Sequence, residues 1–489
     1  MARARTKDRH DYYRLLGLVF IMILFGLIMV LSASSIRAFA STGDSYYYIK
    51  KQSLAALIGF VALMIASRIP LRTIQGLARP AVGLSLIMLV AVLIPGVGKS
   101  AGGATSWFSF GGFQIQPSEI AKLAVIIFTA DVFTRYRKDL DDLKELFYSY
   151  AVVIILVVTL IMLQPDMGTT ITICLAVLAT VFVAGFDLKY LFLLATTGGI
   201  GATYLIYSAS YRLKRISAFL NPSADPLGAG YQIRQSLLAF GSGGLFGVGL
   251  GMSRQKYFYL PAAHTDFIFA IIGEELGLLG TLATIILFAS FAYYGVRISL
   301  KCNSHFGRLL GTGVTSMIVL QALVNMGTVT QILPITGIPM PFISYGGSSL
   351  MVNLAAVGLL LSIAVENERE SKSRRRKSRL SLFDGSQEDL AERKTTSRSR
   401  KTKKSASRKK PVAASSNVVS MKDSKSATSA KATSKKRKAG AKKRSSSSAT
   451  NATGRTKTNA SDNKRRRNSG TRVSGSGTSR STTKSKKRP

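Results

Sequence analysis

Ten apolar runs in the first three quarters of the chain restrict the fold more than any other feature. Most are close to the ~20 residues that an α-helix needs to cross the hydrocarbon core of a bilayer. They lie at about residues 12–34, 52–69, 80–95, 119–134, 146–164, 168–186, 189–208, 267–295, 309–331 and 346–365. Backbone N–H and C=O groups find no water at that depth, so the runs must form helices. The sequence therefore predicts an all-α polytopic membrane protein with about ten transmembrane helices.

Lys and Arg residues in the short loops indicate the orientation, because such loops are usually cytoplasmic. Short basic loops follow the second, fourth and eighth runs, at about residues 68–79, 135–144 and 297–308. Placing them inside makes both termini cytoplasmic and the loops 96–118 and 332–345 external. The large loop 209–266, between spans seven and eight, is then external although it is basic. We predict a cytoplasmic segment 1–11, a membrane domain 12–365 and a cytoplasmic tail 366–489.

The tail carries most of the net charge of +42, with 39 of the 66 Lys and Arg residues. It is otherwise rich in Ser, Thr and Ala and almost lacks aromatic residues, so it cannot bury a core and is predicted to be disordered. Such a tail can contact anionic lipid headgroups or cytoplasmic partner proteins. Nucleic acid is disfavoured as a partner, because base stacking needs interspersed aromatic side chains.

Cysteine and histidine usage excludes several kinds of site. The two cysteines, Cys174 and Cys302, form no disulfide framework, metal-ligand spacing or redox motif. The three histidines are also too few for a His-rich metal site. The first apolar run is long and lacks a small-residue cleavage site, so we interpret it as the first span rather than a signal peptide.

Three carboxylates gather around the start of the eighth apolar run, in LPAAHTDFIFAIIGEELG. Burying an ionisable group in a membrane helix is energetically unfavourable, so its presence there indicates a functional role. The ordinary alternative for Thr265 or Asp266 is an N-cap, and His264 suits an interfacial polar group better than a ligand. On an ideal helix Glu274 and Glu275 project on different sides, so we expect one of them to pair with another helix.

Two further polar motifs precede helices on the predicted external side. In QIQPSEIAK, Pro117 and Glu119 suit the first turn of a helix, with Lys122 on the same face as an ion-pair partner. In LQPDMGTT, Asp166 suits an N-cap or, alternatively, a carboxylate that faces the same cavity as Asp266. Asp166 or Glu119 could also hold a divalent cation such as Mg²⁺ or Mn²⁺.

The segment PITGIPMPFISYGGSS, residues 334–349, contains three prolines that force irregular backbone. Such backbone is tolerated at membrane depth only where it is buried or lines a cavity. Its small residues can serve tight helix packing, or can form a phosphate cradle of N–H and hydroxyl groups. The cradle candidates are Ser344, Gly346, Gly347 and Ser348. The glycines at 241–251 lack a βαβ context for dinucleotide binding and fit a flexible loop.

Together these motifs resemble the SEDS family (shape, elongation, division and sporulation), over residues 12–365 and in the family's order. The shared motifs are QPSE with its following lysine, QPDMGT, GYQIRQSLLAFGSGGLFGVGLG, LPAAHTDFIFAIIGEELG and TGIPMPFISYGGSS. GLGMSRQK before the fourth motif is more like the division branch than the elongation branch. The resemblance implies a multi-pass protein of the bacterial cytoplasmic membrane, at the division septum, that polymerises lipid II into glycan strands.

The resemblance also implies a mechanism. The family's essential acidic residue falls on Asp266, which is expected to act as the base in an inverting glycosyl transfer with an undecaprenyl diphosphate leaving group. Substrate or diphosphate contacts are expected from Glu119, Lys122, Asp166, Arg254, Lys256, Glu275 and the cradle residues. A class B penicillin-binding protein and other division proteins are the implied partners.

Two competing functions fit the apolar pattern. A flippase for a lipid-linked precursor also has many spans, buried charges and broken helices. However, the polar motifs all map to the external side, which favours surface chemistry over a two-sided path. A scaffold that only recruits a partner would have no use for buried carboxylates.

Overall fold

The computed structural model describes residues 3–101, 104–110, 113–136, 143–186, 188–207, 210–373 and 395–396. The helices are α1 (Arg3–Thr42), α2 (Tyr47–Ala66), α3 (Leu71–Gly76), α4 (Ala78–Ala91), α5 (Pro117–Arg135), α6 (Leu143–Leu163), α7 (Met167–Val183), α8 (Leu188–Tyr207), α9 (Ser210–Leu220), α10 (Ala229–Gly243), α11 (Ile268–Leu300), α12 (His305–Val329) and a C-terminal helix, Gly347–Ser373. The predicted tail lies outside the described residues beyond 373, except for 395–396.

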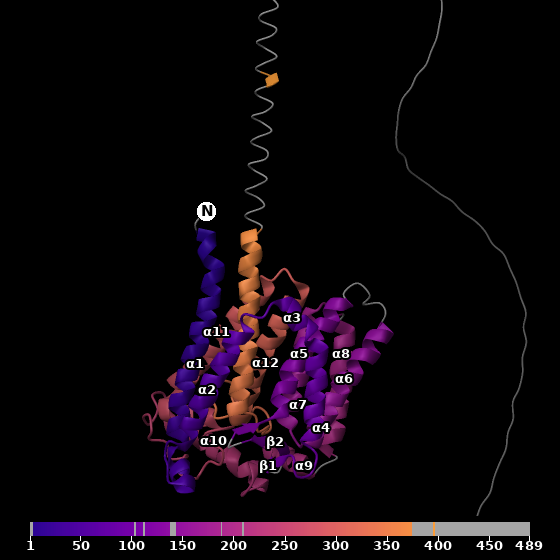
Figure 1. Cartoon of the computed structure of the whole chain (residues 1–489). Coiled ribbons are helices and arrows are strands. Elements are labelled where there is room, and N and C mark those ends of the chain that lie inside the picture. The colour runs from indigo at the N-terminus through magenta and orange to yellow at the C-terminus, as the bar shows by residue number, and fades with distance from the viewer. Residues whose placement is uncertain are drawn as a thin grey trace, which may run out of the picture. The chain divides into compact units, whose positions relative to one another are not determined.

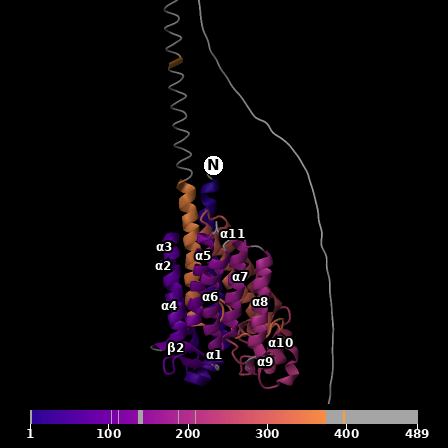
Figure 2. The same ribbon diagram turned by 90° about the vertical axis from the view of Figure 1, so that its right-hand side faces the viewer.

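The described helices form the membrane-type bundle that the apolar runs predicted (Figures 1 and 2). Five helices are long and apolar enough to cross a bilayer: His10–Thr42, Tyr47–Ala66, Ile268–Leu300, His305–Val329 and Gly347–Ser373. Three apolar helices are shorter: Ala78–Ala91, Tyr150–Leu163 and Met167–Val183. The helical architecture is therefore confirmed, while the count of ten spans stays a prediction.

The two ends of the bundle differ in what they carry (Figure 1). The N-terminus and the end of the C-terminal helix lie at one end, together with α3. The opposite end carries α9, α10 and a small sheet. This arrangement agrees with an even number of crossings, and it places the predicted external motifs at the end with the sheet.

The small sheet corrects the all-α prediction. β1 (Lys99–Ala101), β2 (Ala104–Phe110) and β3 (Phe113–Ile115) form an antiparallel meander in the segment predicted only as an external loop. Ser106 ties the sheet to the end of α6, because its hydroxyl donates to the carbonyl of Gln164 at 3.1 Å. β1 and β3 have only three residues each, and β2 (ATSWFSF) does not alternate strictly between polar and apolar residues, so the sequence pattern did not predict these strands.

The large loop 209–266 is also more regular than predicted. It contains α9, a short 3₁₀ turn (η1, Pro222–Ala224) and α10, which packs against α9 and α11. Asp225 fixes the start of α10, since its carboxylate accepts the N–H groups of Gly228 and Ala229 at 3.0 and 2.8 Å. The glycine-rich segment after α10 is held against α11, so the flexible loop predicted for 241–251 was wrong.

Helix α11 breaks at Gly277, where φ is 66° and ψ is −159°. The segment 244–249, which we call the strap, bonds to the backbone on both sides of the break. Val248 and Gly249 donate to the carbonyls of Glu274 and Glu275, and Gly244 and Leu245 accept from Leu278 and Leu279, at 2.9–3.3 Å. The strap therefore supplies hydrogen-bond partners to the backbone groups on both sides of the break.

The strap lies so close to the broken helix that side chains would not fit between them. A Cβ atom on Gly247 would approach the carbonyl oxygen of Glu275 to 2.1 Å, and one on Gly277 would approach the amide nitrogen of Gly247 to 2.4 Å. Both residues also have positive φ, which glycine adopts without strain.

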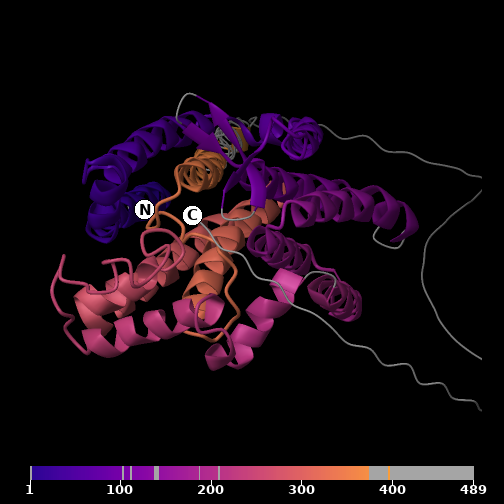
Figure 3. The same ribbon diagram turned by 90° about the horizontal axis from the view of Figure 1, so that it is seen from below.

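Helix α12 and the C-terminal helix form the interior of the bundle. In each of them, 78% of the most apolar 18-residue stretch is buried, compared with 28–39% in the other long apolar helices. Figure 3 shows both between the α1–α2 pair on one side and the helices that follow the sheet on the other. α12 packs against α5, α7 and α11, so its side chains reach the three helices that begin with the predicted polar motifs.

Candidate functional site

A cavity of about 1230 Å³ opens at the end of the bundle that carries the sheet. Its walls come from α2, the sheet, the starts of α5 and α7, helix α9, the segment before α11 and the segment 336–351. Of the sequence-predicted site residues, those on the wall are Glu119, Asp166, Asp266, Gly346 and Gly347. Typical small-molecule pockets measure about 300–1,000 Å³, so this cavity can accept a larger substrate.

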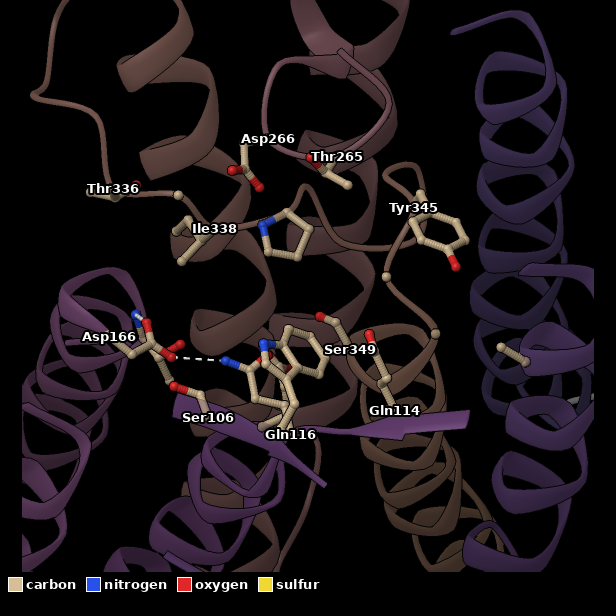
Figure 4. Close-up of a pocket in the computed structure, with 18 of the residues that line it drawn as sticks. Ser106, Gln114, Gln116, Asp166, Thr265, Asp266, Thr336, Ile338, Tyr345 and Ser349 are labelled. Carbon is tan, nitrogen blue, oxygen red and sulfur yellow. Dashed lines mark hydrogen bonds between the residues drawn. The ribbon is translucent and has the colours of Figure 1, made fainter. Parts of the chain in front are cut away.

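Asp266 projects into this cavity from the segment just before α11 (Figure 4). Neither Thr265 nor Asp266 caps the helix: the N-cap position is Phe267, and no side chain caps it. The predicted N-cap role was therefore wrong for both residues. Asp266 instead lies beside Gly337, within 3.8 Å of the place where a Cβ would stand.

The protonation behaviour of Asp266 suits a base. Burial raises the pKa of its carboxyl to about 6, the Arg215 guanidinium opposes this shift, and the charge on Asp166 adds to it. A carboxylate with a pKa near 6 is still ionised at neutral pH but holds a proton far better than an exposed one. Bases work best when their pKa lies near the working pH.

Asp166 fills both of its predicted roles. Its carboxylate caps α7 by accepting the N–H of Thr169 at 3.0 Å. The second oxygen accepts from the Gln116 side-chain amide at 2.9 Å and from the Ser118 hydroxyl at 3.2 Å. The residue also lines the cavity, across from Asp266 (Figure 4). Asp166 therefore joins the ends of α5 and α7 and places a negative charge on the wall.

Glu119 and Lys122 form the predicted ion pair, at 2.9 Å. Glu119 lines the cavity, but the structure does not place Lys122 on the wall. The ammonium group of Lys122 is instead buried and also donates to the Gln321 side chain at 2.7 Å. Lys122 thus joins α5 to α12 and lies off the cavity wall.

Glu274 and Glu275 hold the loop 251–257 against α11. Glu275 pairs with Lys256 at 3.0 Å and accepts from Ser32 of α1 at 2.7 Å, which confirms that one glutamate pairs with another helix. Glu274 accepts the hydroxyl of Ser253 and the backbone N–H of Arg254. Among the described residues, Glu275, Lys256 and Arg254 lie off the cavity wall, so the structure does not bring them to Asp266.

The proposed phosphate cradle is only partly at the cavity. Gly346 and Gly347 line it, but the Gly346 N–H already donates to Gln52 at 3.2 Å. The hydroxyl of Ser344 accepts the N–H of Met340 at 2.8 Å, and that of Ser348 accepts the N–H of Gln116 at 3.0 Å. These serines are engaged in holding the 334–349 segment to its neighbours, rather than facing a ligand.

Two basic residues of the loop 209–266 reach the wall, whereas the α2 side of the wall was not predicted. Arg215 and Lys214 bring positive charge from α9, and Arg215 donates to the carbonyls of Ile335 and Thr336 at 3.3 and 3.4 Å. On the α2 side the wall carries a set of aromatic and basic side chains: Tyr47, Tyr48, Lys51 and Tyr345. The only sequence signal for the α2 group was the run YYYIKK, which combines aromatic and basic residues.

The carboxylates do not fit a site for a divalent cation. Across the described ranges, no three His, Cys, Asp or Glu side chains gather closely enough to hold a metal ion. Glu119 is already neutralised by Lys122, and both oxygens of Asp166 accept hydrogen bonds from the protein.

Comparison with known proteins agrees with this architecture. Residues 13–369 match the family model FtsW/RodA/SpoVE, described as "Cell cycle protein". The chain is 42% identical to "Stage V sporulation protein E" of Bacillus subtilis, over 73% of this chain and 98% of that protein. It is also 42% identical to the "Probable peptidoglycan glycosyltransferase FtsW" of Trichlorobacter lovleyi, over 72% of this chain and 92% of the relative.

Two solved structures share the fold. One chain comes from the work "Structural coordination of polymerization and crosslinking by a peptidoglycan synthase complex", with a TM-score of 0.59, 27% identity and coverage of 73% of this chain and 98% of the other. The second is the rod shape determining protein RodA of Thermus thermophilus, with a TM-score of 0.52, 28% identity and coverage of 72% and 96%. The chain therefore belongs to the FtsW/RodA/SpoVE family of cell cycle proteins, which is the SEDS family that its motifs predicted.

Proposed function

We propose that the protein is a peptidoglycan glycosyltransferase that polymerises lipid II into β-1,4-linked glycan strands at the outer face of the cytoplasmic membrane. The observation that carries the proposal is the position of Asp266. It lies on the wall of a large cavity at one end of a membrane-type bundle, with a pKa raised toward neutrality and basic side chains nearby. The chain covers nearly the whole length of relatives whose names or titles refer to peptidoglycan synthesis, which supports the same reaction.

The proposed reaction is a single displacement with inversion. The 4-hydroxyl oxygen of the acceptor GlcNAc attacks the anomeric carbon of the donor MurNAc, and the bond from that carbon to undecaprenyl diphosphate breaks. Asp266 takes the hydroxyl proton as the bond forms. Lys214 and Arg215, which are basic residues of the loop 209–266, stabilise the charge on the departing diphosphate from the cavity wall. Asp166 adds negative charge beside the base and keeps it basic.

We assign the chain to the division and sporulation branch rather than to the elongation branch. Several FtsW proteins and a sporulation protein are 38–42% identical to this chain. The RodA structure is only 28% identical to it. The resulting setting is the division septum, with a crosslinking class B penicillin-binding protein as partner and other division proteins nearby. The similarity to a chain from a peptidoglycan synthase complex supports such a partner.

A reconstituted assay tests the proposed function. The purified protein is incubated in detergent with its cognate penicillin-binding protein and labelled lipid II, and the products are separated on a gel. We expect a ladder of glycan strands. If a folded preparation that binds lipid II forms no strands but moves lipid II across liposomes, the transport function replaces the polymerase.

The pH dependence of the rate provides a second test of Asp266. Because the base must be ionised, the rate should rise with pH and level off above about 6, and at pH 5 only about one-tenth of the sites should be ionised. Asp166→Asn keeps an N-cap oxygen but removes a charge that raises this pKa, so its profile should shift to lower pH. The rate is measured between pH 4.5 and 8.5. A flat profile in the wild type would contradict a base with this pKa.

A further inference from the structure

Helix α12 carries two buried amides one turn apart, Gln321 and Asn325, and neither side chain is exposed. Both point toward the segment 335–339, which forms part of the cavity wall. Gln321 donates to the carbonyl of Pro339 at 2.9 Å. Asn325 donates to two carbonyls at 2.8 Å, those of Ile338 and Asp266. The second of these bonds reaches the main chain of the base itself.

The carbonyls of this wall segment are held by side chains from two different helices. Arg215 of α9 takes those of Ile335 and Thr336, and the α12 amides take those of Ile338 and Pro339. Gly337 lies between the two pairs and has a φ of 76°, which glycine adopts without strain. The Asp266 carboxylate and the Arg215 guanidinium both lie about 4 Å from the position of a Cβ on Gly337. The geometry of this turn therefore sets the surroundings of the base.

Asn325 is the only described side chain that bonds to the carbonyl of Asp266 and also to the wall segment. Both donated bonds come from its nitrogen, and the side-chain oxygen is buried without a hydrogen-bond partner. An unpaired buried oxygen is unfavourable, and the amide keeps this orientation because its two donated bonds outweigh that cost. Because Asn325 is fully buried, no solvent molecule can take over its two bonds.

We propose that Asn325 is a positioning residue for glycosyl transfer. It fixes the main chain of Asp266 to the wall at Ile338, so that the carboxylate is presented at one place in the cavity. Gln321 supports the same wall and is itself held by Lys122, which pairs with Glu119 of α5. This inference rests on the proposed function, since it assigns how the base of that reaction is held.

Loss of the two bonds should lower kcat more than it raises KM, because the cavity that binds the substrate remains. Misplacing a reacting group by about 1 Å can cost about 100-fold in rate. We therefore expect Asn325→Leu to lower kcat by about 10- to 100-fold. Asn325→Gln keeps the donor on a longer side chain and should recover part of the rate. The pH profile of Asn325→Leu should also shift, because Asp266 moves relative to Arg215 and Asp166.

Asn367 of the C-terminal helix provides a control, since its buried amide donates one hydrogen bond, to the carbonyl of Ile298 at 3.0 Å, and it does not line the cavity. Asn367→Leu should lower thermal stability, although less than Asn325→Leu because only one bond is lost, and should leave kcat and the pH profile unchanged. The experiment measures strand synthesis from labelled lipid II and thermal unfolding for both variants. If Asn325→Leu does not accumulate as folded protein, Asn325→Ser carries the same test, because its side chain is too short to reach both carbonyls and adds no charge.

The outcomes separate this inference from the proposed function. If the wild type makes no strands, the proposed function fails. If the wild type is active and Asn325→Leu retains its full kcat and pH profile, positioning by Asn325 is overturned while the function stands. If Asn325→Leu and Asn367→Leu lose activity equally and only in step with stability, Asn325 is merely structural and the inference is also overturned.

Discussion

Asp266→Asn is expected to abolish strand synthesis while leaving the protein folded. General base catalysis contributes typically about 10²–10⁴-fold, so the residual rate should fall below one-hundredth of the wild type. The fold should survive, since asparagine has the same shape and α11 does not use Asp266 as its cap. Thermal stability should be equal or slightly higher, because the raised pKa shows that burial of the charge is unfavourable in the native state. The measurements are a glycan gel and thermal unfolding on the same preparation.

A control carboxylate lies in the turn before α2. Asp44 pairs with Lys50 at 2.8 Å, and its side chain is 39% exposed. Asp44→Asn should therefore leave strand synthesis within about twofold of the wild type, because exposed ion pairs contribute little. The same preparations also show whether a contaminating enzyme makes the strands, since contamination would persist in Asp266→Asn. Full activity in a folded Asp266→Asn protein would disprove the assignment of the base.

Lys122→Met is expected to cause the largest loss of stability. It leaves Glu119 as a buried carboxylate without its partner, and it also removes the bond to Gln321. Breaking a buried ion pair on one side costs typically about 3–5 kcal/mol. Methionine preserves most of the apolar stem, so lost packing should add little. Unfolding of the detergent-solubilised protein, followed with temperature or denaturant, measures the effect.

A double variant isolates the electrostatic part of this loss. Glu119→Gln removes the carboxylate charge, so combining it with Lys122→Met should restore much of the lost stability. The Glu119→Gln variant alone leaves a buried ammonium and should be destabilised as well. Equal instability of Lys122→Met and the double variant would show that the loss comes from packing or from Gln321, and would contradict the charge explanation.

The parts of the site that could be predicted from sequence depend on short separations along the chain. Asp166 caps α7 by accepting the N–H of Thr169, three residues further along the chain. Glu119 pairs with Lys122 at the same spacing. Helix geometry alone sets both distances, so a sequence pattern is enough to predict them. The apolar runs predicted the helices for the same reason, because the length of a span follows from the thickness of the bilayer.

The remaining contacts depend on how distant elements meet. Asn325 bonds to Asp266 across 59 residues, and Arg215 bonds to Thr336 across 121. Nothing in the surrounding sequence distinguishes Asn325 from an ordinary polar residue in a membrane helix. The N-cap predicted for Thr265 or Asp266 failed because an irregular turn precedes α11 and places the carboxylate in the cavity instead. The sequence analysis expected Glu275 and Lys256 to contact the substrate, whereas they pair with each other off the cavity wall.

The break at Gly277 does not divide α11 into two independent parts. A continuous helix is stiff because each turn is bonded to the next, and an unsupported break would leave the two parts joined at one residue. The strap bonds to Glu274 and Glu275 before the break and to Leu278 and Leu279 after it. It therefore braces the helix across the break, so the part next to Asp266 is held in register with the part that runs on to Leu300.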